Sequence, residues 1–136
     1  MRYLLFPFSL IYASITSIRN LAFDYGIFKS QSHNIPIICI GNLSIGGSGK
    51  TPHTQYIINL IKRNYKVAIL SRGYGRNGSS LQYVEINSSP NQVGDEPLLI
   101  KQTHPDCLVV VEEKRNKGVK QILKDFPKTE VILLDD

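Results

Sequence analysis

Apolar side chains near the N-terminus recur at steps of three or four residues, at Leu4, Phe8, Ile11, Ile15, Ile18 and Leu21. This spacing predicts an apolar N-terminal helix within residues 1–28. No run reaches the roughly 20 apolar residues needed to span a bilayer. The helix therefore either lies on a membrane surface or packs against its own domain. A signal peptide is the rival interpretation because Arg2 precedes a short apolar run, although the apolar period continues past Arg19.

Downstream of this helix, short apolar runs alternate with segments of helical periodicity. Buried strands are predicted at residues 35–40, 66–70, 107–111 and 131–134, and helices at 52–64, 96–102 and 116–126. The intervening residues 77–94 are predicted to form a loop with one short strand near 82–86. Strands that alternate with helices are typical of an α/β fold with a parallel sheet and right-handed crossovers.

The pattern makes two further predictions. The helix at 52–64 is expected to bury Tyr56, Ile57, Leu60 and Ile61. The last strand ends at Asp135 and Asp136, where the sequence stops. Because a domain seldom finishes on a buried strand without a covering element, we expect residues 29–136 to be an incomplete domain of a longer protein.

Composition limits the classes of partner. The chain is 42% hydrophobic and 20% charged, which is ordinary for a folded protein and excludes a disordered one. Its net charge of +5 favours anionic partners but does not separate nucleotides, lipid phosphates and nucleic acid. Cys39 and Cys107 lie in apolar runs and are predicted to be buried, reduced core residues. His33, His53 and His104 lack metal-ligand spacing and are predicted to be surface or structural residues.

The strongest motif is the glycine-rich segment at residues 41–51, which ends in Gly49, Lys50 and Thr51. It has P-loop spacing, with Ser44 where glycine is usual. It also follows a predicted strand and precedes a predicted helix, which favours a nucleotide site over an incidental flexible loop. The predicted nucleotide-binding residues are Ser44, Ile45, Gly46, Gly47, Ser48, Gly49, Lys50 and Thr51.

Each part of this segment suits a polyphosphate. The glycines allow successive backbone N–H groups to converge on phosphate oxygens, and the helix that follows directs its positive end at the same anion. Lys50 supplies a point charge for the β- and γ-phosphates, and the Thr51 hydroxyl can ligate Mg²⁺. The segment therefore predicts ATP and Mg²⁺ as cofactors.

Carboxylates at two further positions are candidates for chemistry. Asp135 and Asp136 end an apolar strand, where a carboxylate can hold Mg²⁺ opposite the P-loop threonine, although a pair of solvated acids has the same pattern. Asp95 lies in the sequence Val-Gly-Asp-Glu-Pro at 93–97. That pattern alone favours an N-cap, and a general base for an acceptor hydroxyl is the alternative.

A basic loop follows the second predicted core strand. Arg72, Tyr74 and Arg76 alternate with glycines just beyond the carboxyl end of the strand, the edge at which α/β sheets bind ligands. Guanidinium groups form paired hydrogen bonds to phosphate, so these residues are candidates for substrate contact. A mobile basic loop explains the same composition equally well.

Four motifs together resemble the tetraacyldisaccharide 4′-kinase family, the lipid A 4′-kinases. They are GNLSIGGSGKTP at 41–52, LSRGYGR at 70–76, VGDEP at 93–97 and a strand that ends in two aspartates. They occur in the family's order, and the apolar N-terminal helix is similar to the family's membrane-associating segment. In the family the aspartates continue into Gly-Phe-Gln-His and a second lobe, neither of which this sequence contains.

The resemblance implies transfer of the ATP γ-phosphate to the 4′-hydroxyl of tetraacyldisaccharide 1-phosphate, which gives lipid IVA at the cytoplasmic face of a Gram-negative inner membrane. It implies that Lys50 and Thr51 hold nucleotide and Mg²⁺, that Asp95 is the catalytic base and that Asp135 and Asp136 are the Mg²⁺-side acids. It makes the loop 72–76 a candidate for lipid-phosphate contact and implies no nucleic-acid partner. The fragment alone is expected to be inactive, because the family's partner histidine lies in the second lobe.

Two other functions compete with this one. A soluble P-loop ATPase that acts as a regulatory switch or carrier would use the same nucleotide loop without a lipid acceptor. A secreted or anchored binding protein would have an incidental glycine-rich loop and an N-terminus processed near residue 13.

Overall fold

The computed structural model describes residues 6–28, 30–41 and 50–135, and these fall into two compact units, residues 1–33 and 34–136. The first unit contains helix α1 (Phe6–Asp24), of which no residue is buried. Within the described ranges, no helix combines the length and the hydrophobicity that crossing a bilayer requires. The predicted N-terminal helix is therefore present, and its apolar side chains are exposed.

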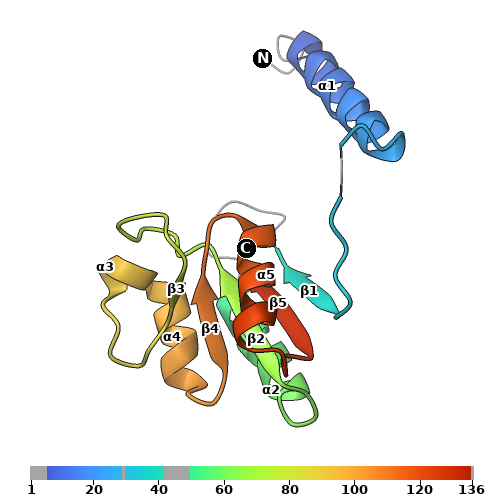
Figure 1. The fold of residues 1–136 in the computed structure, drawn as a ribbon. Helices are drawn as coiled ribbons and strands as arrows, with labels where there is room; N and C mark the ends of the chain where they lie inside the picture. Colours follow the sequence, from blue (N-terminus) through green and yellow to red (C-terminus); the bar gives the residue numbers. More distant parts are fainter. Residues whose placement is uncertain (1–5, 29, 42–49, 136) are drawn as a thin grey trace. The chain divides into compact units, whose positions relative to one another are not determined.

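The second unit is built on a five-stranded sheet in the order β1-β5-β2-β4-β3 (Figure 1). Strands β1 (Ile37–Ile40), β5 (Val131–Asp135), β2 (Val67–Ser71) and β4 (Leu108–Val111) are parallel to one another. The short β3 (Gln82–Tyr83) pairs antiparallel with β4. This confirms the predicted α/β class with a mainly parallel sheet.

Helices cover both faces of the sheet. Helices α2 (Lys50–Ile61), α3 (Pro90–Val93) and α4 (Asp95–Thr103) contribute Ile58, Val93, Leu98 and Ile100 to the buried cluster on one face. Helix α5 (Arg115–Asp125) contributes Val119 and Ile122 to the cluster on the other face, and Figure 1 shows it lying across the central strands. Because both faces are covered, the central strands are apolar at successive positions rather than alternating.

The register of the sheet aligns the strand ends that carry the predicted site. Asp135 pairs with Ile40 of β1 on one side and with Ser71 of β2 on the other, and Ser71 pairs with Val111 of β4. These four residues form a row across the carboxyl edge. The segments that leave this row are the glycine-rich loop, the basic loop and the connection to α5, so all three begin at one edge of the sheet.

Three expectations about the core are wrong. Strand β1 is an edge strand, so Cys39 is exposed although Cys107 is buried as predicted; neither forms a disulfide. Helix α2 buries Thr54 and Ile58 and packs the half-buried Ile57 and Ile61 against the core as predicted, whereas Tyr56 and Leu60 are 66% and 61% exposed. Helix α3 forms within residues predicted to be loop.

Candidate functional site

A hollow of about 360 Å³ lies at the carboxyl edge of the sheet. It is lined by residues from α2, the end of β2, the loop after β2, α4 and the end of β5, namely Lys50, Ser71, Arg72, Tyr74, Glu96 and Asp135. Four of these were predicted from sequence, so the fold brings the phosphate loop's lysine, the basic loop and the strand-end aspartate into one cavity.

Asp135 is the buried carboxylate of this hollow, with 3% of its surface exposed. The Thr54 hydroxyl, also buried, donates a hydrogen bond to its Oδ1 over 3.1 Å. Burial raises the pKa of Asp135 above its usual range, and the nearby charge of Lys50 and the Thr54 hydrogen bond only partly oppose this shift. A carboxylate held in this way gains from a further cation, which suits a Mg²⁺ ligand.

The first turns of α2 and α4 meet beside Asp135. The Thr51 hydroxyl donates to Oε1 of Glu96 over 3.2 Å. Asp95 is the first residue of α4 and is exposed, while Gly94 occupies the N-cap position and makes no side-chain cap. The N-cap interpretation of Asp95 is therefore wrong. Its exposed side chain belongs to the residue before Glu96, which lines the hollow.

Two glycines bring the basic loop against the start of α4. Gly73 and Gly94 have φ values of 68° and 92°, which residues with a side chain rarely adopt. A Cβ on Gly94 would lie 3.0 Å from the carbonyl oxygen of Tyr74, and one on Gly73 would lie 2.8 Å from that of Val93. The two loops therefore pack backbone to backbone, which places Arg72 and Tyr74 near Asp95 and Glu96.

Arg76 does not share the main hollow. Its Nη1 donates to the carbonyl of Ser80 over 2.6 Å, and it lines an adjoining hollow of about 320 Å³ with Arg72, Tyr74 and Glu113. The three predicted substrate residues are thus divided, because Arg72 and Tyr74 line both hollows and Arg76 lines the second.

A buried carboxylate, Glu112, forms an ion pair with the exposed Lys117 in the first turn of α5. Glu112, 2% exposed, accepts hydrogen bonds from Lys117 Nζ over 2.8 Å and from the Lys114 N–H over 3.1 Å. Burial raises the pKa of Glu112, but these bonds, with the charges of Lys117 and Arg76, hold it below its usual range. The pair orders the start of α5, from which Arg115 donates to the Asp135 carbonyl over 3.4 Å.

Sequence reasoning missed Thr54 and Glu96. Glu96 stands next to Asp95 in a recognised motif, and Thr54 lies one helical turn after Lys50. Adjacency in the motif was therefore an available signal for Glu96, and helical spacing was one for Thr54. The basic pair Lys114 and Arg115 after the third core strand suits either a phosphate contact or a mobile basic segment, and the contact of Arg115 with Asp135 depends on where α5 begins. The predicted residues 44–49 and Asp136 lie outside the described part of the chain.

The described residues can contribute to a Mg²⁺ site without enclosing one. No group of three His, Cys, Asp or Glu side chains suitable for a metal occurs within the ranges described. Asp135, Glu96 and the Thr51 hydroxyl offer hard oxygen ligands around one hollow. This set fits Mg²⁺, which is usually held by one or two carboxylates and completes its shell with water and phosphate oxygens.

Known proteins resemble this chain in sequence. A sequence model of the tetraacyldisaccharide-1-P 4'-kinase family, LpxK, matches residues 1–136. The chain is 47% identical to the tetraacyldisaccharide 4'-kinase of Flavobacterium johnsoniae over 136 residues, which cover 100% of this chain and 40% of that relative. It is 45% identical to the Bacteroides thetaiotaomicron enzyme of the same name over 133 residues, 97% of this chain and 35% of that relative.

A solved structure has the same fold. The crystal structure of LpxK from Aquifex aeolicus, described as an "apo" form in complex with ATP, matches with a TM-score of 0.81 and 39% identity. The match covers 98% of this chain and 43% of that one. The chain thus spans about 40% of the length of the relatives cited here. Over that span, its sequence and its fold agree that the chain belongs to the tetraacyldisaccharide-1-P 4'-kinase family.

Proposed function

We propose that this chain is the nucleotide-binding part of an ATP-dependent kinase that phosphorylates the 4′-hydroxyl of tetraacyldisaccharide 1-phosphate. The product, lipid IVA, belongs to lipid A biosynthesis. The observation that carries the proposal is the hollow at the carboxyl edge, which Lys50, Glu96 and Asp135 line, with the Thr51 hydroxyl bonded to Glu96. Asp95 directly precedes Glu96 at the start of α4. The proposed acceptor follows from family membership. The proposed phosphate transfer follows from the charged residues that line the hollow.

The described residues have different proposed roles in phosphate transfer, according to their charge. Lys50 offers a cation to the nucleotide phosphates, while Thr51, Glu96 and Asp135 offer oxygens for the Mg²⁺ that neutralises phosphate charge in such reactions. Asp95, exposed at the start of α4, is the proposed base that takes the proton of the acceptor hydroxyl. Arg72 and Tyr74 extend from the hollow toward the adjoining one and are the proposed contacts for the acceptor's own phosphate.

The acceptor also suggests a location. A tetraacylated disaccharide resides in a membrane, and α1 presents exposed apolar side chains that include Phe8 and Ile15. We therefore propose that the protein binds peripherally, through α1, to the cytoplasmic face of a Gram-negative inner membrane.

Titration calorimetry with this chain tests the nucleotide site. Lys50→Ala should weaken MgATP binding about tenfold or more, because hydrogen bonds to charged groups contribute about 1.5–3 kcal/mol. Asp95→Ala should leave that affinity within about twofold, because the base acts on the acceptor. The exposed Lys128, on another edge of the unit, gives the control variant Lys128→Ala.

The transfer reaction needs a chain of the relatives' full length. In that protein Asp95→Ala should lower kcat for the disaccharide acceptor by about 10²–10⁴-fold, the usual range for loss of a general base. If Asp95→Ala instead abolishes MgATP binding, Asp95 belongs to the nucleotide site. If the intact protein binds MgATP but phosphorylates no glycolipid, a regulatory ATPase replaces the kinase.

A further inference from the structure

Helices α2 and α4 lie on the same face of the sheet and run in the same direction. Both contribute to one buried cluster, through Ile58 of α2 and through Leu98 and Ile100 of α4. Both also begin at the carboxyl edge, where Thr51 donates to Glu96. Their opposite ends therefore meet at the other edge of the sheet, away from the proposed chemistry.

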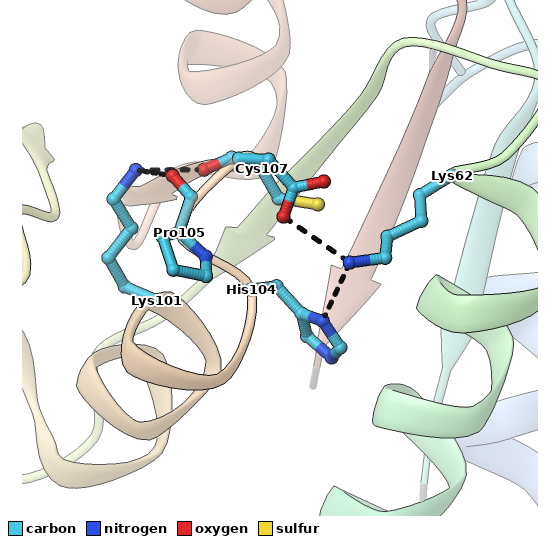
Figure 2. A network of polar contacts seen from close by, with 6 residues as sticks. Lys62, Lys101, His104, Pro105 and Cys107 are labelled. Carbon is cyan, nitrogen blue, oxygen red and sulfur yellow. Dashed lines mark hydrogen bonds and ion pairs between the residues drawn. The ribbon is translucent and has the colours of Figure 1, made fainter.

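Lys62, the residue after α2, joins these opposite ends (Figure 2). Its Nζ lies 3.4 Å from Nδ1 of His104, the C-cap of α4, and 3.3 Å from Oδ1 of Asp106. An ammonium group only donates hydrogen bonds, so His104 Nδ1 is the acceptor. Lys62 thus stands near the carboxyl ends of two helices, where a positive charge is favoured.

The partners of Lys62 belong to a turn that is itself fixed. The His104 N–H donates to the Ile100 carbonyl over 2.8 Å, and His104 is 2% exposed. Lys101 Nζ donates to the carbonyls of Pro105 and Cys107, each over 3.0 Å, as Figure 2 shows. Strand β4 begins directly after this turn, so the acceptors of Lys62 are anchored to the sheet as well as to α4.

Stability alone does not explain this arrangement. The side chains of Lys62 and Asp106 are 26% and 63% exposed, and exposed ion pairs typically contribute about 0–1 kcal/mol. The effect of this contact on the position of the catalytic residues is larger than its effect on stability. Helix α2 has 12 residues and is about 18 Å long, so a tilt of about 5° at Lys62 would move Lys50 and Thr51 by about 1.5 Å. A misplacement of about 1 Å can lower a rate about 10²-fold.

We propose that Lys62 is a positioning residue that fixes the separation between the amino ends of α2 and α4. It acts through His104 and Asp106, and it thereby sets the distance from Lys50 and Thr51 to Glu96 and Asp95. The catalytic meaning of that distance rests on the proposed function, whereas the mechanical tie between the helices does not. Two measurements separate these parts.

The first measurement tests the tie without any ligand. Backbone amide relaxation-dispersion NMR is recorded for the wild-type chain, Lys62→Met, Lys62→Arg and the control Lys128→Met, whose lysine lines the same hollow as Lys62 but lies on neither helix. Lys62→Met should introduce microsecond-to-millisecond exchange at Thr51, Thr54 and Glu96, Lys62→Arg should suppress it, and Lys128→Met should match the wild type. Unchanged amides in Lys62→Met would overturn the tie. Asp106→Asn, which removes an exposed acceptor, serves as the second variant if Lys62→Met does not fold.

The second measurement tests the consequence for the site. Lys62→Met should weaken MgATP binding about three- to tenfold and metal-free ATP binding less, because Thr51 and Glu96 act through the metal. Lys62→Arg should restore the affinity. A loss that Lys128→Met shares, or that arginine does not restore, overturns the positioning role. If the wild-type chain binds no MgATP, the proposed function fails, and the NMR result still decides whether the tie exists.

Discussion

Two buried carboxylates at the carboxyl edge have opposite electrostatic surroundings. Glu112 is paired with Lys117 and with a backbone N–H, and its pKa lies below the usual range. Asp135 accepts a hydrogen bond from neutral Thr54, and burial holds its pKa above the usual range. An isolated buried carboxylate is costly unless it is paired or coordinates a metal. The contrast is consistent with a structural role for Glu112 and supports the proposed ligand-binding role of Asp135, although both residues lie at the ends of apolar strands.

A glycine pair provides a residue-scale prediction. Gly94 and Gly78 have nearly equal φ values of 92° and 93°, but a Cβ on Gly78 meets nothing within 4 Å, whereas one on Gly94 meets backbone atoms of Gly73 and Tyr74. Each alanine substitution should lower the free energy of unfolding by about 1–2 kcal/mol through φ. Gly94→Ala should lose about 1–2 kcal/mol more, because backbone atoms cannot move aside as a side chain can.

Chemical denaturation of the two alanine variants measures this difference. Because Gly78 has nearly the same φ and open surroundings, Gly78→Ala is the control for a positive φ, and the excess loss in Gly94→Ala reports the contact between the two loops together with the ψ of 155° at Gly94. Equal losses in both variants would mean that the loops can separate without cost.

The burial of a strand was predicted correctly where helices cover both of its faces, and incorrectly where the strand lies at the edge of the sheet. Residues 67–71 form an uninterrupted buried strand because α2 and α5 cover opposite faces of β2. The equally apolar 37–40 segment is an edge strand, which its own sequence does not reveal, because strand order is a property of the whole sheet. The wrong prediction that Tyr56 and Leu60 are buried has the same origin. The face that α2 turns toward the sheet depends on the order of the strands beneath it, and the sequence of α2 does not contain that order.

The junction of α2 and α4 predicts a pH dependence. Burial, with a contribution from Lys62, lowers the pKa of His104 below its usual value, and Asp106 opposes this only in part. The unfolded chain therefore binds more protons than the folded chain below about pH 6.5, so the free energy of unfolding falls as the pH falls from about 7 toward 5. Denaturation curves measured between about pH 5 and 7 should show this change in the free energy of unfolding. A single titrating group limits the change to about 1.4 kcal/mol per pH unit.

Substitution separates the effect of His104 from that of the other histidines of the chain. His104→Phe should flatten the dependence, because no ring nitrogen remains to be protonated beside Lys62. Replacement of the exposed His53 by Gln should leave the slope in place. A slope that survives in His104→Phe would assign the effect to another group.

At the scale of the whole molecule, the sequence predicted which edge of the sheet carries the site, but only part of its residue set. The glycine-rich motif, the basic loop and the terminal aspartate each follow a strand, and parallel strands place such ends together. Glu96 and Arg115 join the site only because α4 begins beside Thr51 and α5 begins beside Asp135. These contacts depend on sheet register and helix packing. The spacing of apolar residues within one segment does not encode either of them.

The N-terminal unit carries the last prediction. Helix α1 has 19 residues, none of them buried, with exposed apolar side chains that include Phe8 and Ile15. If these side chains enter a lipid interface, Phe8→Ser together with Ile15→Ser removes about 3–6 kcal/mol of gross apolar transfer free energy. Flotation with vesicles of phosphatidylethanolamine and phosphatidylglycerol should then show at least about a tenfold weaker partition, because about 1.4 kcal/mol corresponds to a factor of ten.

A matched pair of apolar residues in the other unit separates lipid contact from general hydrophobicity. Tyr56 and Leu60 of α2 are as exposed as Phe8 and Ile15, so Tyr56→Ser with Leu60→Ser removes comparable apolar surface from a helix outside α1. Partition should fall for the α1 pair and remain unchanged for the α2 pair. An equal fall in both would indicate nonspecific adsorption of exposed apolar surface. Unchanged partition in the α1 variant, combined with a lower unfolding midpoint, would instead assign the apolar face of α1 to protein packing, since only a face buried against protein stabilises the fold when no lipid is present.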